Sequence, residues 1–114
     1  MSDDLFLKII DREIPADIVF EDDEVLAFRD IDPQAPVHVL IVPKRRIPTI
    51  NDLEEADAGL VGRMLLTARK IAADEGLSED GYRLVFNCNE RGGQSVYHIH
   101  LHLLGGRQMN WPPG

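Results

Sequence analysis

Val96-Tyr97-His98-Ile99-His100-Leu101-His102-Leu103-Leu104 is a run in which histidine alternates with aliphatic side chains over most of its length. Such alternation predicts a β-strand, because side chains two residues apart project from the same face. We therefore expect a last strand over residues 96–104, with the three histidines on one face and the aliphatic residues on the other. The aliphatic face would lie against a core, so the imidazoles would face solvent or a polar site.

The rest of the chain predicts further short strands. Residues 18–20 and 25–28 flank an acidic stretch and read as a hairpin. Residues 38–42 are apolar enough to form a strand buried on both faces, and residues 82–88 predict another strand. Short strands with hairpin-type links favour an antiparallel sheet, and the helices described next make the fold class α+β.

One long and one short helix are expected. The long helix would span residues 53–75, starting at Asn51 or Asp52 as its cap and ending at Gly76 in a left-handed conformation. Its core-facing stripe would consist of Leu60, Met64, Ala68, Ile71 and Ala72, widened by Val61 and Leu65. The short helix would start at Ser2, and its apolar residues recur at helical spacing: Leu5, Phe6, Ile9 and Ile10.

Composition narrows the class of protein. The 114 residues suit a single domain over 1–114, which a dimer would help to stabilise. The net charge of −8 argues against nucleic acid as a partner. No apolar run reaches the roughly 20 residues of a membrane helix, so no membrane partner is expected. The single cysteine, Cys88, reads as a small strand residue and fits a reducing compartment, so a cytoplasmic location is expected.

A row of histidines can bind a metal ion. Imidazole is a common zinc ligand, but in a strand the outer Cα atoms of this row would stand ~13 Å apart, too far for one ion to hold all three rings. Two of them with His38, the fourth histidine, could still form a site. However, no cysteine pair and no His-Glu-x-x-His motif accompanies them. We therefore expect no metal and no other cofactor.

Nucleophilic catalysis is the interpretation that the row favours. Imidazole titrates near neutrality and can attack, accept a proton or donate one. Crowding raises the cost of protonating every ring, which leaves a neutral nucleophile beside a proton-carrying partner. His100 is flanked on both sides and is the candidate for attack on phosphorus. In the preceding loop, a turn at Gly92 and Gly93 can aim N–H groups at phosphate oxygens, and Ser95 offers a hydroxyl suited to protonating a leaving group.

These residues stand in a longer pattern that resembles the histidine triad superfamily, specifically its Hint branch of nucleotide-binding proteins. The resemblance covers nearly the whole chain and rests on residues 6–10, 13–16, 28–31, 33–38, 92–102 and 105–114. It implies a HIT-like antiparallel sheet with a packed helix, continued across a homodimer interface. It also implies a purine nucleoside phosphoramidase, acting on adenosine or guanosine monophosphate joined through phosphorus–nitrogen to an amine.

The resemblance implies a role for each matching residue. His100 corresponds to the nucleophile that becomes transiently nucleotidylated, and the backbone carbonyl of His98 to the group that orients it. His102 and Ser95 correspond to groups that contact the phosphate and the leaving atom, and His38 to a supporting histidine in the proton network. The implied nucleotide-binding residues are Asp30 at the ribose hydroxyls, Ile9, Ile14, Phe28 and Ile31 around the base, and Asn87, Gly93 and Gln94 beside the phosphate and leaving group.

Several alternatives stay open at this point. One alternative is that Asp30 binds no ligand and serves merely to start the turn before Pro33. A nucleotidyltransferase or dinucleoside-polyphosphate hydrolase of the same superfamily would share the histidine row, and a noncatalytic nucleotide sensor would share the site. Ser95 and the tail favour the Hint branch, in which Trp111 would contact the partner subunit. Asn110, where relatives often carry histidine, and residues 88–91 depart from the pattern and leave the preferred amine undetermined.

Overall fold

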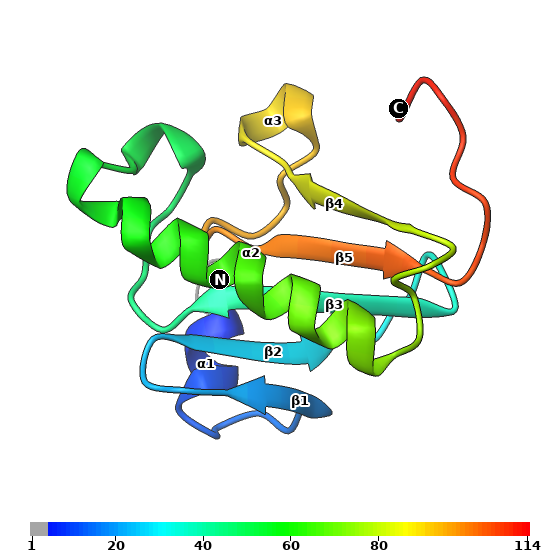
Figure 1. Ribbon diagram of the computed structural model, residues 1–114. Coiled ribbons are helices and arrows are strands. Elements are labelled where there is room, and N and C mark those ends of the chain that lie inside the picture. Colours follow the sequence, from blue (N-terminus) through cyan, green and yellow to red (C-terminus); the bar gives the residue numbers. More distant parts are fainter. Residues whose placement is uncertain (1–4) are drawn as a thin grey trace.

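The computed structural model describes residues 5–114 and consists of one five-stranded sheet with helices on both faces (Figure 1). All neighbouring strands are antiparallel. Their spatial order is β1 (Ile18–Glu21), β2 (Val25–Arg29), β3 (Val37–Pro43), β5 (Leu101–Gly105) and β4 (Tyr82–Phe86). The α+β class and the antiparallel sheet expected from the sequence are confirmed. The proposed cap at Ser2 lies outside the described residues.

The two faces of the sheet have separate cores because neighbouring residues of a strand point to opposite sides. Helix α2 (Ala58–Asp74) covers one face, whose buried residues include Val25, Ala27, Val39, Ile41, Leu101 and Leu103. Helix α1 (Leu5–Ile10) packs on the other face, whose buried residues include Leu26, Phe28, Leu40 and Val42. His102 lies opposite Leu40 in the β3–β5 ladder, so its ring belongs to the α1 face.

Helix α2 begins later than expected. Two 3₁₀ turns, η2 (Ile50–Asp52) and η3 (Glu55–Asp57), precede it. Asp52 and Asp57 each accept the backbone N–H of the residue three positions earlier. These bonds close residues 49–57 into separate turns, so the expected start near residue 53, capped at residue 51 or 52, is wrong. Gly76 follows the helix with a φ of 76°, the left-handed conformation expected there.

The buried stripe of α2 is narrower than the sequence indicates. Met64, Ala68, Ile71 and Ala72 are buried as expected, and Leu60 and Val61 are half-buried. Leu65 is 41% exposed, so its assignment to the stripe is wrong. A single helix on a sheet buries only the line of side chains that points directly at the strands, which leaves neighbouring leucines at the surface.

The last strand begins at Leu101, and the prediction of a strand over residues 96–104 is wrong for its first half. The β3–β5 ladder ends at the pair Ile41 and Leu101. The segment before Leu101 crosses instead to residues 43–48, where the N–H of Ile99 donates to the carbonyl of Ile47 over 2.8 Å. A hydrogen bond to a neighbouring loop thus replaces the strand pairing that periodicity predicted.

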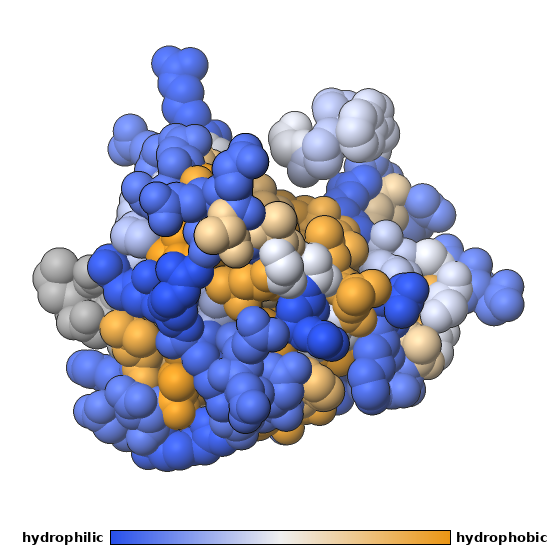
Figure 2. Space-filling model, turned by 60° about the vertical axis from the view of Figure 1, so that its left-hand side comes forward, coloured by the Kyte–Doolittle hydropathy of each residue, from blue (hydrophilic) through white to orange (hydrophobic). Residues whose placement is uncertain are grey.

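Strand β4 is also shorter than predicted, because it ends at Phe86 and a one-turn helix, α3 (Asn89–Gly92), follows in the expected loop. Cys88 is therefore not a strand residue: it lies half-buried just before α3. On the side shown in Figure 2, hydrophobic residues reach the surface in patches between hydrophilic ones. None of the helices within residues 5–114 is both long enough and apolar enough to cross a membrane.

Candidate active site

Two of the histidines border a cavity of about 240 Å³ on the α1 face of the sheet. His100, His102 and Ser95 line one part of it and Asp30 another. The remaining walls are mainly apolar and come from α1, the segment after it, and the strands: Leu5, Phe6, Ile9, Ile14, Pro15, Ala16, Phe28, Arg29, Ile31, Leu40 and Val96. An apolar chamber with a few converging polar groups is the usual form of a small-molecule site.

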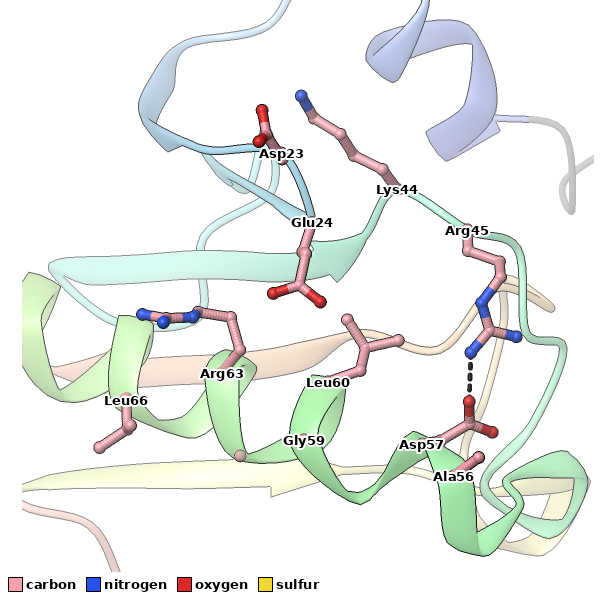
Figure 3. A pocket seen from close by; sticks show the side chains of 11 residues that line it. Asp23, Glu24, Lys44, Arg45, Ala56, Asp57, Gly59, Leu60, Arg63 and Leu66 are labelled. Atoms are coloured by element: carbon pink, nitrogen blue, oxygen red, sulfur yellow. Dashed lines mark hydrogen bonds and ion pairs between the residues drawn. The ribbon is translucent and has the colours of Figure 1, made fainter.

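A larger hollow of about 590 Å³ lies on the α2 side, between the β1–β2 turn and the helix (Figure 3). Three of its charged side chains have partners: Arg45 pairs with Asp57, and Lys44 bonds to Glu21 over 2.7 Å. It contains no histidine, serine or cysteine. The smaller cavity is therefore the candidate active site, because it holds the groups able to do nucleophilic and proton-transfer chemistry.

The geometry of His100 leaves one ring nitrogen free to attack. Its Nδ1 lies 2.9 Å from the backbone carbonyl oxygen of His98. A carbonyl oxygen can only accept, so Nδ1 carries the proton and Nε2 keeps its lone pair. The ring is buried and lines the cavity. This is the state that a nucleophilic imidazole needs.

A chain of three hydrogen-bonding groups sets the tautomer of His102. The backbone N–H of Gln34 donates to Nδ1 of His38 over 3.0 Å, so the proton of His38 is on Nε2. That N–H donates to Nδ1 of His102, also over 3.0 Å, which leaves the proton of His102 on its Nε2. Within the described residues this buried Nε2–H has no acceptor. Beside His100, it is a donor suited to a negatively charged ligand.

His98 does not take part in an imidazole row facing the cavity. Its ring is 0% exposed, and Nε2 donates to the carbonyl of Pro43 over 2.7 Å. Phe6 contacts both neighbouring rings edge-on, with centroids 5.9 Å from His98 and 5.0 Å from His100. The expectation that all three imidazoles face solvent or a polar site is thus wrong for His98, because the segment turns inward before β5 begins.

All four histidines are disposed to stay neutral. Burial lowers the pKa of His38, His98 and His100 below the ordinary histidine value, and the Asp30 carboxylate partly opposes this at His38 and His100. For His102 burial is again the largest cause, and the nearby rings of His100 and His38 add to it, which lowers its pKa to about 4. The crowding considered from the sequence therefore contributes, but desolvation contributes more.

These shifts predict that the protein loses stability between pH 7 and pH 5. A histidine with an ordinary pKa in the unfolded chain binds a proton in this range, whereas buried His102 does not until about pH 4. The unfolded state then holds more protons, so the free energy of unfolding must fall as the pH falls. We expect a loss of about 2 kcal/mol, measured by urea unfolding at both pH values. A free energy of unfolding that rises toward pH 5 would contradict this.

Asp30, His38 and His102 are the described group whose donor atoms lie close enough to bind one metal ion, all within 4.8 Å of one another. A metal-bound histidine normally donates its other ring N–H to a neighbour. Here the other nitrogen of His38 accepts from the N–H of Gln34, so the proton sits on the nitrogen that would have to bind the metal. The donor set fits a proton relay and does not fit a metal site.

The apolar residues predicted to surround a base are brought together. Ile9, Ile14 and Phe28 line the cavity, and Ile31 lies at its rim, 97% exposed. Asp30 lines it as well, and its contacts include one that is typical of a turn. Its Oδ1 accepts the N–H of Asp32, as in a turn, while Oδ2 lies 3.5 Å from Nε2 of His38.

The residues predicted beside the phosphate do not line the cavity. They are Asn87, Gly93 and Gln94. The N–H of Gly93 donates to the carbonyl of Glu90, and that of Gln94 to the carbonyl of Asn89. The N–H of Gly93, which was expected to meet phosphate, is therefore used inside the α3 turn.

Sequence reasoning did not identify three contributors to this site. Phe6 was assigned to a helix core on its spacing, although it also packs on the ring of His100. The N–H of Gln34 and the carbonyl of Pro43 are backbone groups. Backbone groups carry no signal in a single sequence, so only the fold reveals their partners.

Comparison with known proteins shows the family of this chain. The family model of the HIT domain matches residues 11–109. The purine nucleoside phosphoramidase of Escherichia coli K12 is 60% identical over 105 residues, covering 92% of this chain and 88% of its own length. An uncharacterized HIT-like protein of Synechococcus elongatus is 58% identical over 115 residues, with both chains fully covered.

A solved structure gives the same result for the fold. The crystal structure of a HIT family hydrolase from Legionella pneumophila Philadelphia 1 superposes with a TM-score of 0.95 at 65% identity. The match covers 96% of this chain and 98% of that one. The residues matched by the HIT domain model include all four histidines and the loop before the last three. The chain belongs to the HIT domain family.

Proposed function

We propose that this protein is a purine nucleoside phosphoramidase, which hydrolyses the phosphorus–nitrogen bond of adenosine or guanosine 5′-monophosphoramidates. The observation that carries the proposal is that two ring nitrogens with complementary roles lie near each other at one cavity. Nε2 of His100 holds a free lone pair, and the adjacent ring of His102, 4.9 Å away between centroids, presents an unpartnered N–H. A nucleophile beside a donor for an anionic oxygen suits attack on a phosphoryl group. The 60% identical phosphoramidase of Escherichia coli supports the same substrate class.

In the first step Nε2 of His100 forms a bond to the α-phosphorus while the phosphorus–nitrogen bond breaks. The bonding electron pair goes to the leaving nitrogen, which takes the proton of the Ser95 hydroxyl and departs as the amine. The carbonyl of His98, 2.9 Å from Nδ1, stabilises the positive charge that the substituted imidazole acquires. The N–H of His102 would donate to a phosphoryl oxygen throughout.

In the second step water attacks phosphorus, and the phosphorus–Nε2 bond breaks with its electron pair returning to His100. The water proton restores the Ser95 hydroxyl. The sum is one phosphoramidate and one water converted to an amine and a nucleoside monophosphate, so the enzyme ends unchanged. No metal or other cofactor enters either step.

The apolar part of the cavity would hold the nucleoside. Ile9, Ile14 and Phe28 offer flat apolar walls for a purine, with Ile31 at the rim. The Asp30 carboxylate, which lines the same cavity, would accept from the ribose hydroxyls. The nearby Asn87, Gly93 and Gln94 belong to the loop on the leaving-group side.

The test is turnover of an adenosine phosphoramidate by the purified protein. We expect release of adenosine monophosphate and amine, with undiminished activity after exhaustive chelation. Binding of the nucleotide without any product at high enzyme concentration would favour a nucleotide sensor. Cleavage of dinucleoside polyphosphates in preference to phosphoramidates would favour the other hydrolase of the superfamily.

We also propose a homodimer whose sheet continues through β4. Within the described residues nothing pairs with the outer edge of β4, whose side chains are all half-buried. The opposite edge strand, β1, is short and has an irregular register, which is typical of a protected edge. The tail after β5 runs toward the β4 side (Figure 1), and Trp111 within it is 83% exposed. A tryptophan this exposed is suited to contact a partner subunit.

Sedimentation velocity tests the dimer, and we expect twice the 12.8 kDa of one chain at micromolar concentration. A monomer at all concentrations would contradict it.

We further propose that residues 1–114 act as one domain, and that the free thiol of Cys88 reflects a cytoplasmic location.

A further inference from the structure

Gln94 has the most extensively bonded side chain in the loop before the histidines. Its side chain is 7% exposed overall, although its neighbours Gly93 and Ser95 are exposed. Oε1 accepts the backbone N–H of Asn89 over 2.8 Å. Nε2 donates to the carbonyl of Pro48 over 2.7 Å and to that of Val96 over 3.0 Å. Both amide protons and the amide oxygen are therefore engaged inside the protein.

The amide ties together two parts of the chain that are distant in sequence. Asn89 is the first residue of α3 and has a φ of 60°, a left-handed conformation that asparagine tolerates. Its N–H belongs to the first turn, where helices leave donors without partners, and Gln94 supplies the acceptor. The bond to Pro48 then attaches this loop to the segment that follows β3.

Residues 43–48 also accept hydrogen bonds from the stretch of chain that contains His100. The ring of His98 donates to the carbonyl of Pro43, and the N–H of Ile99 donates to the carbonyl of Ile47. Together with the Gln94 bond, three hydrogen bonds fasten residues 94–100 along residues 43–48. Because residues 94–100 lie outside any strand, these bonds take the place of a ladder in setting where the loop and His100 stand relative to each other.

The position of Ser95 depends most directly on the hydrogen bonds of the Gln94 amide. Ser95 follows Gln94, lines the cavity beside His100, and within residues 5–114 its hydroxyl makes no hydrogen bond that would hold it. Its place is set by the main chain between Gln94 and Val96, and the carbonyl of Val96 is itself an acceptor of the Gln94 amide.

We propose that Gln94 is a positioning residue for the proton transfer to the leaving group, acting through Ser95 and not through contact with the nucleotide. This role rests on the proposed phosphoramidase function. It replaces the nucleotide contact that resemblance implies for this residue, because a fully bonded inward-turned amide has no donor left to offer a phosphate.

The test uses two adenosine phosphoramidates, one of an alkylamine and one of an arylamine, and the variant Gln94→Met, which keeps the volume but loses all three bonds. An alkylamine needs protonation to depart and an arylamine needs it less. We expect kcat/KM to fall about 30-fold for the alkylamine and about 3-fold for the arylamine, since loss of general-acid alignment acts on the poorer leaving group. The affinity for adenosine monophosphate should change less than about 3-fold, because the nucleoside walls lie elsewhere.

A double-mutant cycle assigns the effect to Ser95. In a Ser95→Ala background, Gln94→Met should cost less than about 3-fold on the alkylamine substrate, because the group that it positions is already gone. Gln94→Glu, which keeps the acceptor but lacks both donors, should show the same leaving-group dependence if Gln94→Met fails to fold. Gln108→Met is the matched control, since that amide is exposed and bonds only within the tail.

Equal losses on the two substrates would overturn the positioning role, because a general loss of structure does not distinguish leaving groups. A fall in nucleotide affinity as large as the fall in turnover would also overturn it, in favour of direct contact. Absence of turnover by the unmodified protein contradicts the proposed function and this role together, whereas turnover with equal losses contradicts this role alone.

Discussion

Replacing His100 by glycine is expected to lower kcat on an adenosine phosphoramidate by at least about 10⁴-fold, as is usual when the nucleophile of a covalent mechanism is removed. Within residues 5–114, Nε2 of His100 has a lone pair and no hydrogen-bonding partner, since Nδ1 is committed to the carbonyl of His98. His102 cannot substitute for it, because its cavity-facing nitrogen carries a proton. Single-turnover kinetics with rapid quench measures the loss.

Binding must survive in this variant if the assignment is correct. The walls of the nucleoside site come from α1 and β2, so adenosine monophosphate should bind with nearly unchanged affinity by calorimetry. The unmodified protein, quenched in acid-free denaturant during turnover, should carry a nucleotidyl group on His100 by mass spectrometry. Turnover of the glycine variant within tenfold of the unmodified protein would remove His100 from the role of nucleophile.

Replacing His98 by alanine is expected to have the largest effect on stability, a loss of about 3–4 kcal/mol in the free energy of unfolding. The ring is completely buried and packs edge-on against Phe6, so its removal leaves a cavity. The buried carbonyl of Pro43 also loses its donor. Thermal and urea unfolding followed by circular dichroism measure the change.

His98→Phe separates the structural role of the ring from a catalytic one. Phenylalanine fills most of the same volume but cannot donate to Pro43, so we expect a smaller loss of about 1–2 kcal/mol. The backbone carbonyl that orients His100 is present in this variant, so kcat should fall no more than about tenfold. If His98→Phe were as stable as the unmodified protein and yet as inactive as the His100 variant, the ring of His98 would be a catalytic group.

The sequence predicted the sheet well because strands and helices differ in period. The hairpin of β1 and β2, the apolar strand β3 and the long helix follow from local patterns and were found where expected, apart from their ends. The ends differ because Asp52 and Asp57 close turns that compete with the helix, and because the β3–β5 ladder stops at Ile41. Competition of this kind depends on partners that the local pattern does not contain.

The candidate site, like the fold, was predicted in part from the sequence. Alternation singled out the histidine row, and the flanked position of His100 singled it out within the row, but alternation put all three rings on one face. The structure separates them: His98 is an anchor in the core, His100 has a free lone pair on Nε2, and His102 is a donor whose tautomer is set by His38 and the N–H of Gln34. Gln94 changes from a ligand contact to a support of the loop.

The sequence by itself determined the fold class, the family and the chemical groups available, because these follow from periodicity, composition and the order of residues. Only the tertiary structure decided which nitrogen of each histidine carries its proton and which residues face the cavity. The physical reason is that a tautomer is set by the group opposite each ring nitrogen. For His98, His38 and His100 those groups are backbone atoms of Pro43, Gln34 and His98, and for His102 the group is the ring of His38. Their positions depend on how the whole chain packs.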